Sequence, residues 1–583
     1  MTTYHGIPGS EGIAAGKALV YRNVPFTIPQ GSVTAKSIPQ EQQKLHSAVE
    51  AVRSALQQRI KTLSDALGSG EAEIFEAHLS VLDDPEVVGA AQDVIAAEKL
   101  PAAAAIWKTC KSIAEEFRLM DDEYFRARAA DILDVGEQIV RELTGEKGVS
   151  LSHLDGPCIV ISRDITPSET ALMDKKNVLA MVCEMGSRTS HAIILSRSLG
   201  IPAVVGAKDI STATNDGEMV IVNGRTGEVT VGADEAAVTA ALKTREGELM
   251  VKKSLKRSAL LEAVTSDGAI KKVEGNIGRP EDAAAVLENG GDGIGLFRSE
   301  FFYMDSTGFP TEEAQYQGYC CALKTMGDRP VIVRTMDIGG DKKLPYFELE
   351  PEMNPFLGYR ALRIGLDRKE IFKPQLRALL RAALHGNLSI MLPMVSCTEE
   401  IIAAKSIIEE CRQELLQANI PFRADVPVGI MIEIPSIALQ ARDAAKLVDF
   451  FSIGTNDLIQ YCIAADRMNQ NVAGLYKTFH PGVLRLIASV ITEAHKTGIT
   501  VGMCGEMAGD LLSIPVLLGL GLDNFSMSAS RIPMAKHLVR NLSAKNCREI
   551  AMKVIDQPDA AAAEQAVKDW IFSEPELVTI YNG

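Results

Sequence analysis

The sequence predicts an α/β multidomain chain with a C-terminal (β/α)8 barrel and an N-terminal α/β unit that contains an inserted helical bundle. Three observations support this fold class. A length of 583 residues is enough for several domains. Apolar residues at steps of three and four mark long helices near the N-terminus. After about residue 270, eight short apolar segments alternate with helical segments, which is typical of a (β/α)8 barrel.

The composition excludes several functional classes. Acidic residues number 76 against 60 basic ones, and the formal charge of -16 argues against a surface for nucleic acid or anionic lipid. The longest uncharged stretch, Ala382 to Thr398, is too short and too polar for a membrane span, and the N-terminus lacks a basic region followed by an apolar run. The cysteines form no CxxC pair, which indicates reduced thiols. We therefore expect a soluble, cytoplasmic protein without membrane insertion.

The first quarter of the chain changes from strand to helix. Gly12 to Arg22 resembles a strand, and the next apolar residues lie on one helical face. Further helical stretches are expected at 72–97, 101–118 and 121–144, which predicts a bundle over 25–144. Thr62 to Glu98 has no Lys or Arg, so it is either a solvated acidic face or a docking surface for a basic partner. The helical face consists of Leu45, Val49, Val52, Leu56, Ile60, Leu63 and Leu67.

The region that follows the bundle shows strand-like segments separated by turn residues. We expect a mixed α/β unit over 1–24 and 145–232, in which the early strand pairs with later ones across the helical insertion. The charged stretch Lys243 to Arg257 predicts an exposed linker helix within 233–262. The expected strands are Cys158–Ser162, Asn177–Cys183, Ala203–Val205 and Met219–Val222.

The barrel is predicted over 263–583, and polar residues follow its strands. Arg298, Arg334, Glu433, Asp457 and Cys504 each lie at or just after a strand end, which is the catalytic face of such a barrel. Repetition at six strand ends makes isolated structural ion pairs an improbable explanation. The expected strands are Val273–Ile277, Gly293–Phe297, Val331–Arg334, Ile390–Pro393, Gly429–Ile434, Phe450–Ile453, Thr500–Met503 and Asn524–Met527.

The residue types at this face predict a chemistry. Arginine offers a planar fork that matches carboxylate or phosphate oxygens, so several arginines indicate a small, densely anionic ligand. Glu433 and Asp457 supply the sparse carboxylate set with which proteins bind Mg²⁺, and Asn456 is a candidate to hold a phosphate oxygen. Together these residues suggest magnesium-assisted chemistry on a phosphorylated carboxylate. The candidate arginines are Arg298, Arg334, Arg360 and Arg467.

Two further residues are candidates for a chemical step. Cys504 is either a small buried hydrophobe or a thiol with a near-neutral pKa that exchanges a proton with carbon. His191 follows a predicted strand and the cap candidates Thr189 and Ser190, which places it in the first turn of a helix. There it is either a solvated surface residue or a neutral, nucleophilic imidazole beside an anion site.

Several long motifs, in order along nearly the whole chain, resemble enzyme I, the phosphoenolpyruvate-protein phosphotransferase family of the bacterial sugar phosphotransferase system. One departure is Ser187, where the family commonly has a second glycine beside Gly186. The motifs are Gly186–His191, Asp292–Glu300, Arg334–Lys342, Asn354–Arg360, Phe451–Asp457 and Gly502–Glu506.

The resemblance implies that phosphoenolpyruvate phosphorylates His191, which then passes the phosphoryl group to a histidine of the carrier HPr or a homologue. It implies that Arg298, Arg334 and Arg467 hold the phosphate and that Arg360 supports the phosphate or the carboxylate. It further implies that Glu433 and Asp457 bind Mg²⁺, that Asn456 contacts phosphate, and that Cys504 protonates the enolate to pyruvate. The helical insertion would dock HPr, and two barrels would pair into a homodimer.

Two alternatives remain at this point. Pyruvate phosphate dikinase and phosphoenolpyruvate synthase have similar phosphohistidine and barrel modules, but they need a nucleotide-binding domain for which the helical region is too short. A signalling scaffold that only senses phosphoenolpyruvate is the non-enzymatic alternative. Labelling by phosphoenolpyruvate and Mg²⁺ alone distinguishes these alternatives.

Overall fold

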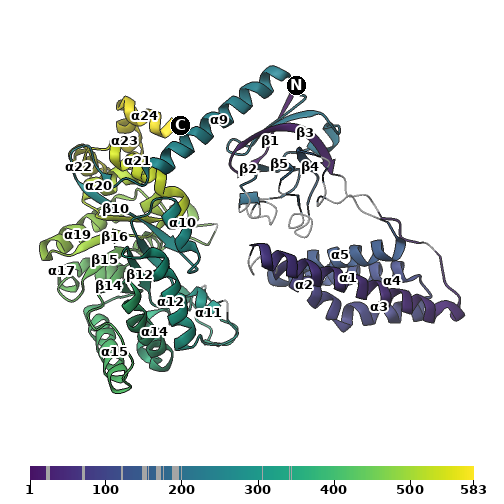
Figure 1. Cartoon of the computed structure of the whole chain (residues 1–583), viewed down its shortest axis with the longest axis horizontal. Coiled ribbons are helices and arrows are strands. Elements are labelled where there is room, and N and C mark those ends of the chain that lie inside the picture. The colour runs from purple at the N-terminus through teal and green to yellow at the C-terminus, as the bar shows by residue number, and fades with distance from the viewer. Residues whose placement is uncertain are drawn as a thin grey trace. The chain divides into compact units, whose positions relative to one another are not determined.

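The computed structural model describes residues 1–583 except 22–25, 30, 68–72, 120–122, 147–150, 152–153, 155, 166–172, 175, 187–192, 194–195, 198–199, 305, 341, 343, 470 and 583. The chain divides into two units, Met1–Leu249 and Met250–Gly583 (Figure 1). Within the described residues, no helix has both the length and the apolar character that a membrane span requires.

The first unit contains a mixed eight-stranded sheet with the order β1-β8-β7-β3-β4-β5-β6-β2. Its longest strand, β3 (Ile13–Tyr21), pairs in parallel with β4 (Cys158–Ser162). This pairing confirms that the early strand joins the later ones across the helical insertion. The remaining elements of the sheet are β1 (Thr2–His5), β2 (Ile7–Ser10), β5 (Val178–Cys183), β6 (Ala203–Val205), β7 (Met219–Asn223) and β8 (Glu228–Val231), with the short helix α8 (Ile210–Ala213).

Five helices form the inserted bundle of the first unit. The predicted stripe lies on α1 (Ile38–Leu67), where Leu45 and Leu56 are fully buried. The single helical stretch expected over 72–97 is wrong, because it is two helices. Asp84 caps the second of them by accepting a hydrogen bond from the Glu86 N–H, and Pro85 occupies its first position. The other helices are α2 (Glu73–Asp83), α3 (Pro85–Glu98), α4 (Ala102–Leu119) and α5 (Glu123–Thr144).

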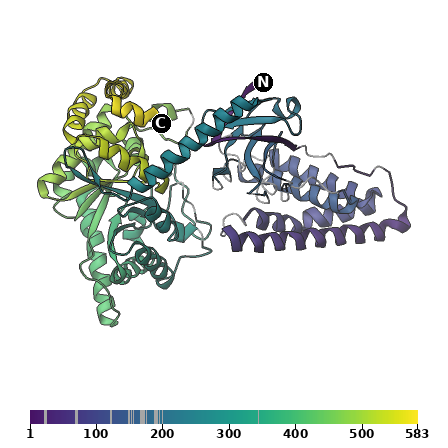
Figure 2. The same cartoon turned by 45° about the horizontal axis from the view of Figure 1, so that its top comes forward.

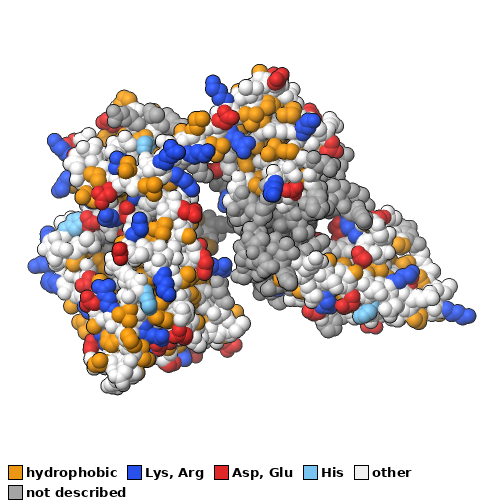
Figure 3. Space-filling view, in the orientation of Figure 1, with side chains coloured by type: hydrophobic (Ala, Val, Ile, Leu, Met, Phe, Trp, Pro, Cys, Tyr) orange, Lys and Arg blue, Asp and Glu red, His pale blue; other side chains and the backbone are white. Residues whose placement is uncertain are grey.

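The predicted linker helix is α9 (Glu235–Ser258), which contains the division between the two units. Basic side chains gather over its C-terminal part, where Lys256 and Arg257 lie in the last turn (Figure 3). Lysine and arginine near a helix C-terminus interact favourably with the partial negative charge of the helix dipole there. The charged sequence thus forms a solvated helix, as expected.

The second unit contains the predicted barrel. Its strands β10 (Ile270–Ile277) to β17 (Asn524–Met527) are parallel, and β10 pairs with both β11 and β17, so the sheet closes (Figures 1 and 2). Each of the eight predicted strands overlaps one of these. A short strand, β9 (Ala263–Val264), adds to β10 in antiparallel fashion. The strands between are β11 (Ile294–Arg298), β12 (Pro330–Arg334), β13 (Asn387–Leu392), β14 (Val428–Ile432), β15 (Phe450–Ile453) and β16 (Thr500–Met503).

Helices surround the barrel strands. Apolar side chains between strands and helices form the main core, while a smaller cluster fills the barrel interior around Met391, Met431 and Phe450. The helices are α10 (Asp282–Glu288), α11 (Phe301–Met304), α12 (Glu312–Met326), α13 (Leu362–Asp367), α14 (Lys369–Ala382), α15 (Thr398–Gln417), α16 (Pro435–Leu439), α17 (Ala441–Ala444), α18 (Thr455–Ile463), α19 (Pro481–Thr497), α20 (Ser513–Leu520), α21 (Ile532–Asn541), α22 (Ala544–Ile555), α23 (Ala560–Ser573) and α24 (Pro575–Asn582).

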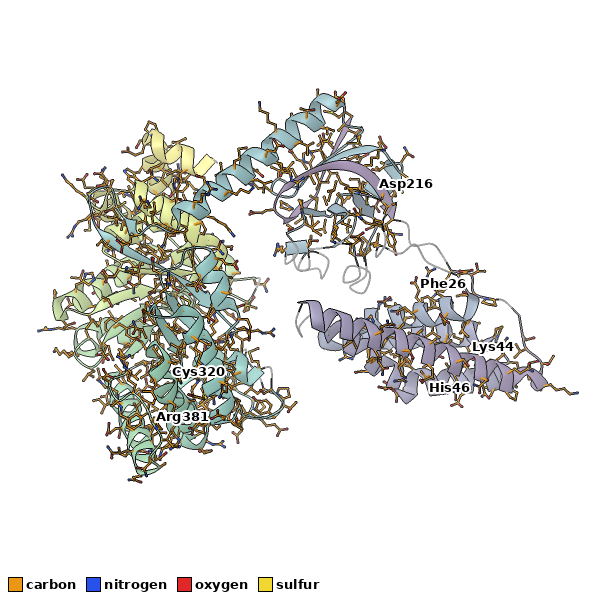
Figure 4. The ribbon with its side chains drawn as sticks, in the orientation of Figure 1. Phe26, Lys44, His46, Asp216, Cys320 and Arg381 are labelled. Atoms are coloured by element: carbon orange, nitrogen blue, oxygen red, sulfur yellow. The ribbon has the colours of Figure 1, made fainter. Side chains whose placement is uncertain are left out.

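A charged contact joins α12 and α14 on the outside of the barrel. Arg381 of α14, labelled in Figure 4, binds Glu312 at 2.6 Å and Glu313 at 2.8 Å, and its guanidinium carbon lies 4.2 Å from the centre of the Tyr316 ring. A stacked arginine with two carboxylate partners orders both helices. In the chain, α12 follows β11, and α14 follows the loop after β12. The contact therefore helps to hold the ends of these two strands in place.

We expect Asp267→Ala to lower the melting temperature of the barrel unit by about 1–4 °C. Asp267, in the β9–β10 turn, accepts hydrogen bonds from the first two N–H groups of α22, at 2.9 Å from Ala544 N and 3.0 Å from Lys545 N. Alanine leaves both donors without this acceptor. Calorimetry of the variant and of Asp328→Ala, a change in an exposed turn, measures the difference. Equal shifts for both variants would contradict a capping role.

Candidate active site

The structure places most of the predicted site residues at the C-terminal face of the barrel. Arg298 and Arg334 are the last residues of β11 and β12, and Glu433 and Cys504 directly follow β14 and β16. Asn456 and Asp457 lie in the first turn of α18, after β15, and Arg467 lies in the turn that follows α18. His191, with Thr189 and Ser190, lies outside the described residues.

A network of buried charges lies beneath this face. Asp337 binds Arg360 Nη2 through both carboxylate oxygens, at 2.9 and 3.1 Å, and Lys342 Nζ at 2.8 Å. Arg334 Nη2 lies 3.3 Å from Asp337 and also binds Glu300, which accepts a second bond from Lys342 at 2.9 Å. Burial raises the pKa of Asp337, but Arg334, Lys342 and Arg360 outweigh it and hold that pKa well below its ordinary value.

The network fixes two of the predicted arginines by carboxylates that we did not predict as site residues. Glu300, Asp337 and Lys342 belong to the motifs after β11 and β12, and the spacing of Arg334 and Asp337, three residues apart, was the available signal. Arg360 Nη1 donates a hydrogen bond to Tyr461 Oη, at 3.4 Å, and Tyr461 in turn donates to the Phe356 carbonyl at 2.5 Å. The loop before Arg360 is thereby tied to α18.

Glu433 and Asp457 form a pair of buried carboxylates beside this network. Glu433 Oε1 accepts a hydrogen bond from Met394 N–H at 2.6 Å, and Met394 has an unusual positive φ of 56°. Gly454 makes room for Glu433, since a Cβ there would lie 2.9 Å from Glu433 Oε2. Burial, with Asp457 and then Asp337 adding to it, raises the pKa of Glu433 to about 7.

The donor set of this pair fits a divalent cation of the Mg²⁺ class. The side-chain oxygen Asp457 Oδ1 is buried and accepts no hydrogen bond from the described residues, and its nearest cation is Arg467 Nη2 at 3.9 Å. In the described part of the chain, no group of three or more His, Cys, Asp or Glu side chains could hold a metal. Two carboxylates are too few for an all-protein cage, but they suit Mg²⁺, which usually retains water and substrate oxygens as ligands.

A cavity of about 520 Å³ opens at the same face. Arg298, Asn456 and Cys504 contribute to its lining, which brings together a cation, an amide and a thiol from three strand ends. Asn456 Oδ1 accepts a hydrogen bond from the Glu506 N–H at 3.0 Å, so its Nδ2 is the atom left to donate to an anion.

The sequence hypothesis of a near-neutral pKa for Cys504 is wrong for this structure. Only 4% of Cys504 is exposed, and burial raises its pKa above that of an ordinary thiol, although Ser452 and Arg334 lower it in part. Cys504 therefore keeps its proton at neutral pH. A protonated thiol suits a proton donor rather than a nucleophile.

Most of the chain is similar to known protein families. Residues 252–544 match the family model "PEP-utilising enzyme, PEP-binding domain", residues 5–128 the model "PEP-utilising enzyme, N-terminal", and residues 154–227 the model "PEP-utilising enzyme, mobile domain". A solved structure described as the NMR solution structure of Enzyme I (nEIt) is 37% identical over 42% of this chain and 99% of its own, with a TM-score of 0.39.

Curated relatives match nearly the full length. The phosphoenolpyruvate-protein phosphotransferase of Staphylococcus carnosus is 43% identical over 96% of this chain and 97% of its own. That of Priestia megaterium is 46% identical over 92% and 94%, and that of Enterococcus faecalis is 45% identical over 95% and 96%. With a closed barrel and polar side chains at its strand ends, the chain belongs to the phosphoenolpyruvate-protein phosphotransferase family and is a phosphoenolpyruvate-dependent phosphotransferase.

Proposed function

We propose that the chain transfers the phosphoryl group of phosphoenolpyruvate to its own His191 and then to a histidine of HPr or a homologue. Pyruvate is released, and the reaction is the first step of a sugar phosphotransferase system. The observation that supports this most is the cavity itself, because Arg298, Asn456 and Cys504 line it together. The phosphate, the carboxylate and the enol carbon of phosphoenolpyruvate can each contact a suitable group in this cavity.

Substrate binding falls to the cationic groups of the barrel face. Arg298 lines the cavity, and Arg467 lies 3.9 Å from Asp457. Arg334 and Arg360 are held rigid by Glu300 and Asp337, so they keep their orientation before substrate arrives. Charge placed in advance of the reaction stabilises a phosphoryl transition state without reorganisation.

Glu433 and Asp457 would hold Mg²⁺. When bound, the ion would supply charge neutralisation for the phosphate and carboxylate oxygens of phosphoenolpyruvate. The pair fits this role because its members are buried together and Asp457 Oδ1 accepts no hydrogen bond from the described residues.

Cys504 would complete the reaction after phosphoryl transfer. The enolate of pyruvate takes the thiol proton at C3, the C–O bond becomes the ketone, and the thiolate regains a proton from solvent. The raised pKa of Cys504 keeps the proton on sulfur until the enolate forms. Protonation at carbon favours product, because the ketone is more stable than the enol.

The carrier would dock on the helical bundle. Thr62 to Glu98 has no basic residue, which matches a basic partner by charge. Two barrels would pair into a homodimer, as the family resemblance implies. Titration of HPr onto the protein tests the docking. Sedimentation of the protein tests the pairing of two barrels.

Labelling of the full chain with radioactive phosphoenolpyruvate tests the proposed function. With Mg²⁺ alone, one acid-labile, base-stable phosphoryl group per chain is expected, and addition of HPr should transfer it. Label that requires ATP would favour a dikinase. Tight binding of phosphoenolpyruvate without any label would favour a sensor. Omission of Mg²⁺ should reduce labelling. Unchanged labelling after chelation would show that the reaction does not require the metal.

We expect Cys504→Ser to lower the turnover number about 100-fold or more, with the KM for phosphoenolpyruvate within threefold of the wild type. Serine fits the space of the thiol, but its hydroxyl is far too weak an acid to donate the proton. Steady-state kinetics of pyruvate release measures both constants. Cys547→Ser, a change at another buried cysteine outside the cavity lining, is the matched control. Unchanged turnover in Cys504→Ser would return the thiol to a packing role.

A further inference from the structure

Three residues from three neighbouring strands meet where the barrel closes. Asn276 of β10 donates a hydrogen bond from Nδ2 to the Cys504 carbonyl oxygen at 3.0 Å. Ser526 of β17 donates from its hydroxyl to Asn276 Oδ1 at 2.6 Å. The strand order is β16-β17-β10, so the Asn276 side chain reaches past β17 to the residue that follows β16.

Cys504 needs this bond because strand pairing stops before it. The register between β16 and β17 comprises Gly502 opposite Asn524 and Met503 opposite Phe525, and Cys504 is the next residue. Its N–H is held on the β15 side, by Ile453 O at 3.1 Å. Its carbonyl, on the other side, receives the Asn276 amide in place of a strand partner. The Cys504 backbone is thus held from both sides, which fixes the position of its Cβ, and the thiol donates a long hydrogen bond to the Ile453 carbonyl oxygen at 3.9 Å.

The Asn276 side chain is aimed and oriented by its surroundings. The register between β10 and β11 shifts between Gly275 and Asn276, an irregularity of the kind that redirects side chains near active sites. Ser526 is 2% exposed, and because the Cys504 carbonyl oxygen can only accept, the amide presents Nδ2 to it and Oδ1 to the Ser526 hydroxyl. With Oδ1 bound to Ser526, only Nδ2 faces Cys504. Asn276 also lines the 520 Å³ cavity, so the bond lies beside the substrate space.

We propose that Asn276, oriented by Ser526, is a positioning residue that aims the Cys504 thiol at C3 of the enolate formed from phosphoenolpyruvate. The proposal rests on the proposed role of Cys504 as proton donor. The S–H bond breaks as the C3–H bond forms, the enolate oxygen becomes the ketone oxygen of pyruvate, and the thiolate regains its proton from solvent. Asn276 exchanges no proton in this step; it holds the donor in place.

The expected effect is on proton transfer rather than on binding. A misplacement of about 1 Å in a reacting group costs about 100-fold in rate. We therefore expect Asn276→Ala to lower the turnover number about 10- to 100-fold, with the KM for phosphoenolpyruvate within threefold. Asn276→Asp retains the acceptor for Ser526 but loses the donor to Cys504, so its turnover number should fall as far as that of Asn276→Ala. Ser526→Ala removes the hydrogen-bond partner of Asn276 Oδ1 and should lower turnover about three- to tenfold.

Stereochemistry supplies a readout that a merely structural role does not change. Phosphoenolpyruvate with one deuterium at C3 in a defined Z configuration is converted in tritiated water, and the chirality of the pyruvate methyl group is determined. Proton delivery by a fixed thiol gives one enantiomer in excess. Enolpyruvate that escapes and ketonises in solution gives the racemate. Both Asn276 variants should therefore give largely racemic pyruvate, and Ser526→Ala a partial loss of the excess.

Asn524→Ala is the matched control, because Asn524 begins the same strand as Ser526 but does not line the cavity. It should keep wild-type turnover and chirality. Wild-type turnover or an undiminished excess in folded Asn276→Ala would overturn the proposal. If Asn276→Ala does not fold, Ser526→Ala provides the test. An undiminished enantiomeric excess of the pyruvate methyl group in Ser526→Ala would then overturn the proposal. Cys504→Ser separates the two levels: wild-type chirality in that variant refutes the proton donor itself, whereas racemic product there with normal Asn276→Ala refutes only the positioning.

Discussion

His191→Ala is expected to abolish phosphorylation of the protein while the barrel still binds phosphoenolpyruvate. The motif from Gly186 to His191 belongs to the first unit, whereas the cavity, the arginines and the carboxylate pair belong to the second. Removal of the imidazole therefore eliminates the phosphoryl acceptor without altering a group of the cavity. Labelling with radioactive phosphoenolpyruvate and titration calorimetry measure the two properties separately.

The histidine control is a residue of the same type in the barrel unit. His385→Ala changes a ring that bonds Tyr316 Oη at 2.9 Å on the outer helices, and it should leave labelling at the wild-type level. Persistent acid-labile, base-stable label in His191→Ala would refute the assignment of His191. A binding constant for phosphoenolpyruvate weakened more than about threefold would refute the separation of acceptor and cavity.

Asp337→Ala is expected to destabilise the barrel unit by about 3–5 kcal/mol and to eliminate most turnover. Asp337 is 1% exposed and holds Arg360, Lys342 and Arg334, so its removal takes away the carboxylate that binds Arg360 and leaves Arg334 and Lys342 with Glu300 alone in the network. Two methods measure the loss of stability. Calorimetry follows thermal unfolding, and the fluorescence of Trp570, which lies in the barrel unit, follows unfolding by denaturant.

The pH dependence of this effect has a defined sign. The pKa of Asp337 is depressed in the folded state, so its contribution to stability is fully present above the ordinary carboxyl pKa of about 3.9 and is lost only as the pH falls toward the folded-state pKa. The contribution from Asp337 itself should be constant from about pH 8 to pH 5, and Glu433, whose pKa of about 7 is raised in part by Asp337, should add a pH dependence near neutrality. Asp425→Ala, which breaks an exposed pair with Arg423, should destabilise the protein far less than Asp337→Ala does. A similar loss in both variants would contradict the role of burial.

The barrel was predictable because each strand is a short apolar segment flanked by polar turns, and a closed parallel sheet places all strand ends on one face. The short strands β1, β2 and β8 were not predicted, because their sequences TTYH, IPGS and EVTV contain no apolar run and do not alternate with helical segments as the barrel strands do. The break between α2 and α3 was missed although Asp84 and Pro85 form a standard helix start. An apolar spacing that continues through both helices hid it.

The site was predictable to the extent that chemistry follows a strand end. Arg298, Glu433, Asp457 and Cys504 were proposed in this way, and the structure confirms that each lies at or just after a strand end. Asn276 was not, because it lies within β10 and its partner Cys504 is 228 residues away. The register between β10 and β11 shifts at Asn276, and a linear sequence contains no signal for such a shift.

The seam between β10 and β17 has a consequence for biosynthesis. Asn276 and Ser526 are 250 residues apart, and at about 5–20 residues per second the ribosome needs about 12–50 s to travel between them. The first unit, Met1–Leu249, is complete before β10 is even translated. A nascent chain therefore contains the whole first unit long before its barrel can close. The residues that line the cavity extend along the chain from Asn276 to Arg531, so its wall is complete only after the last strand has been translated.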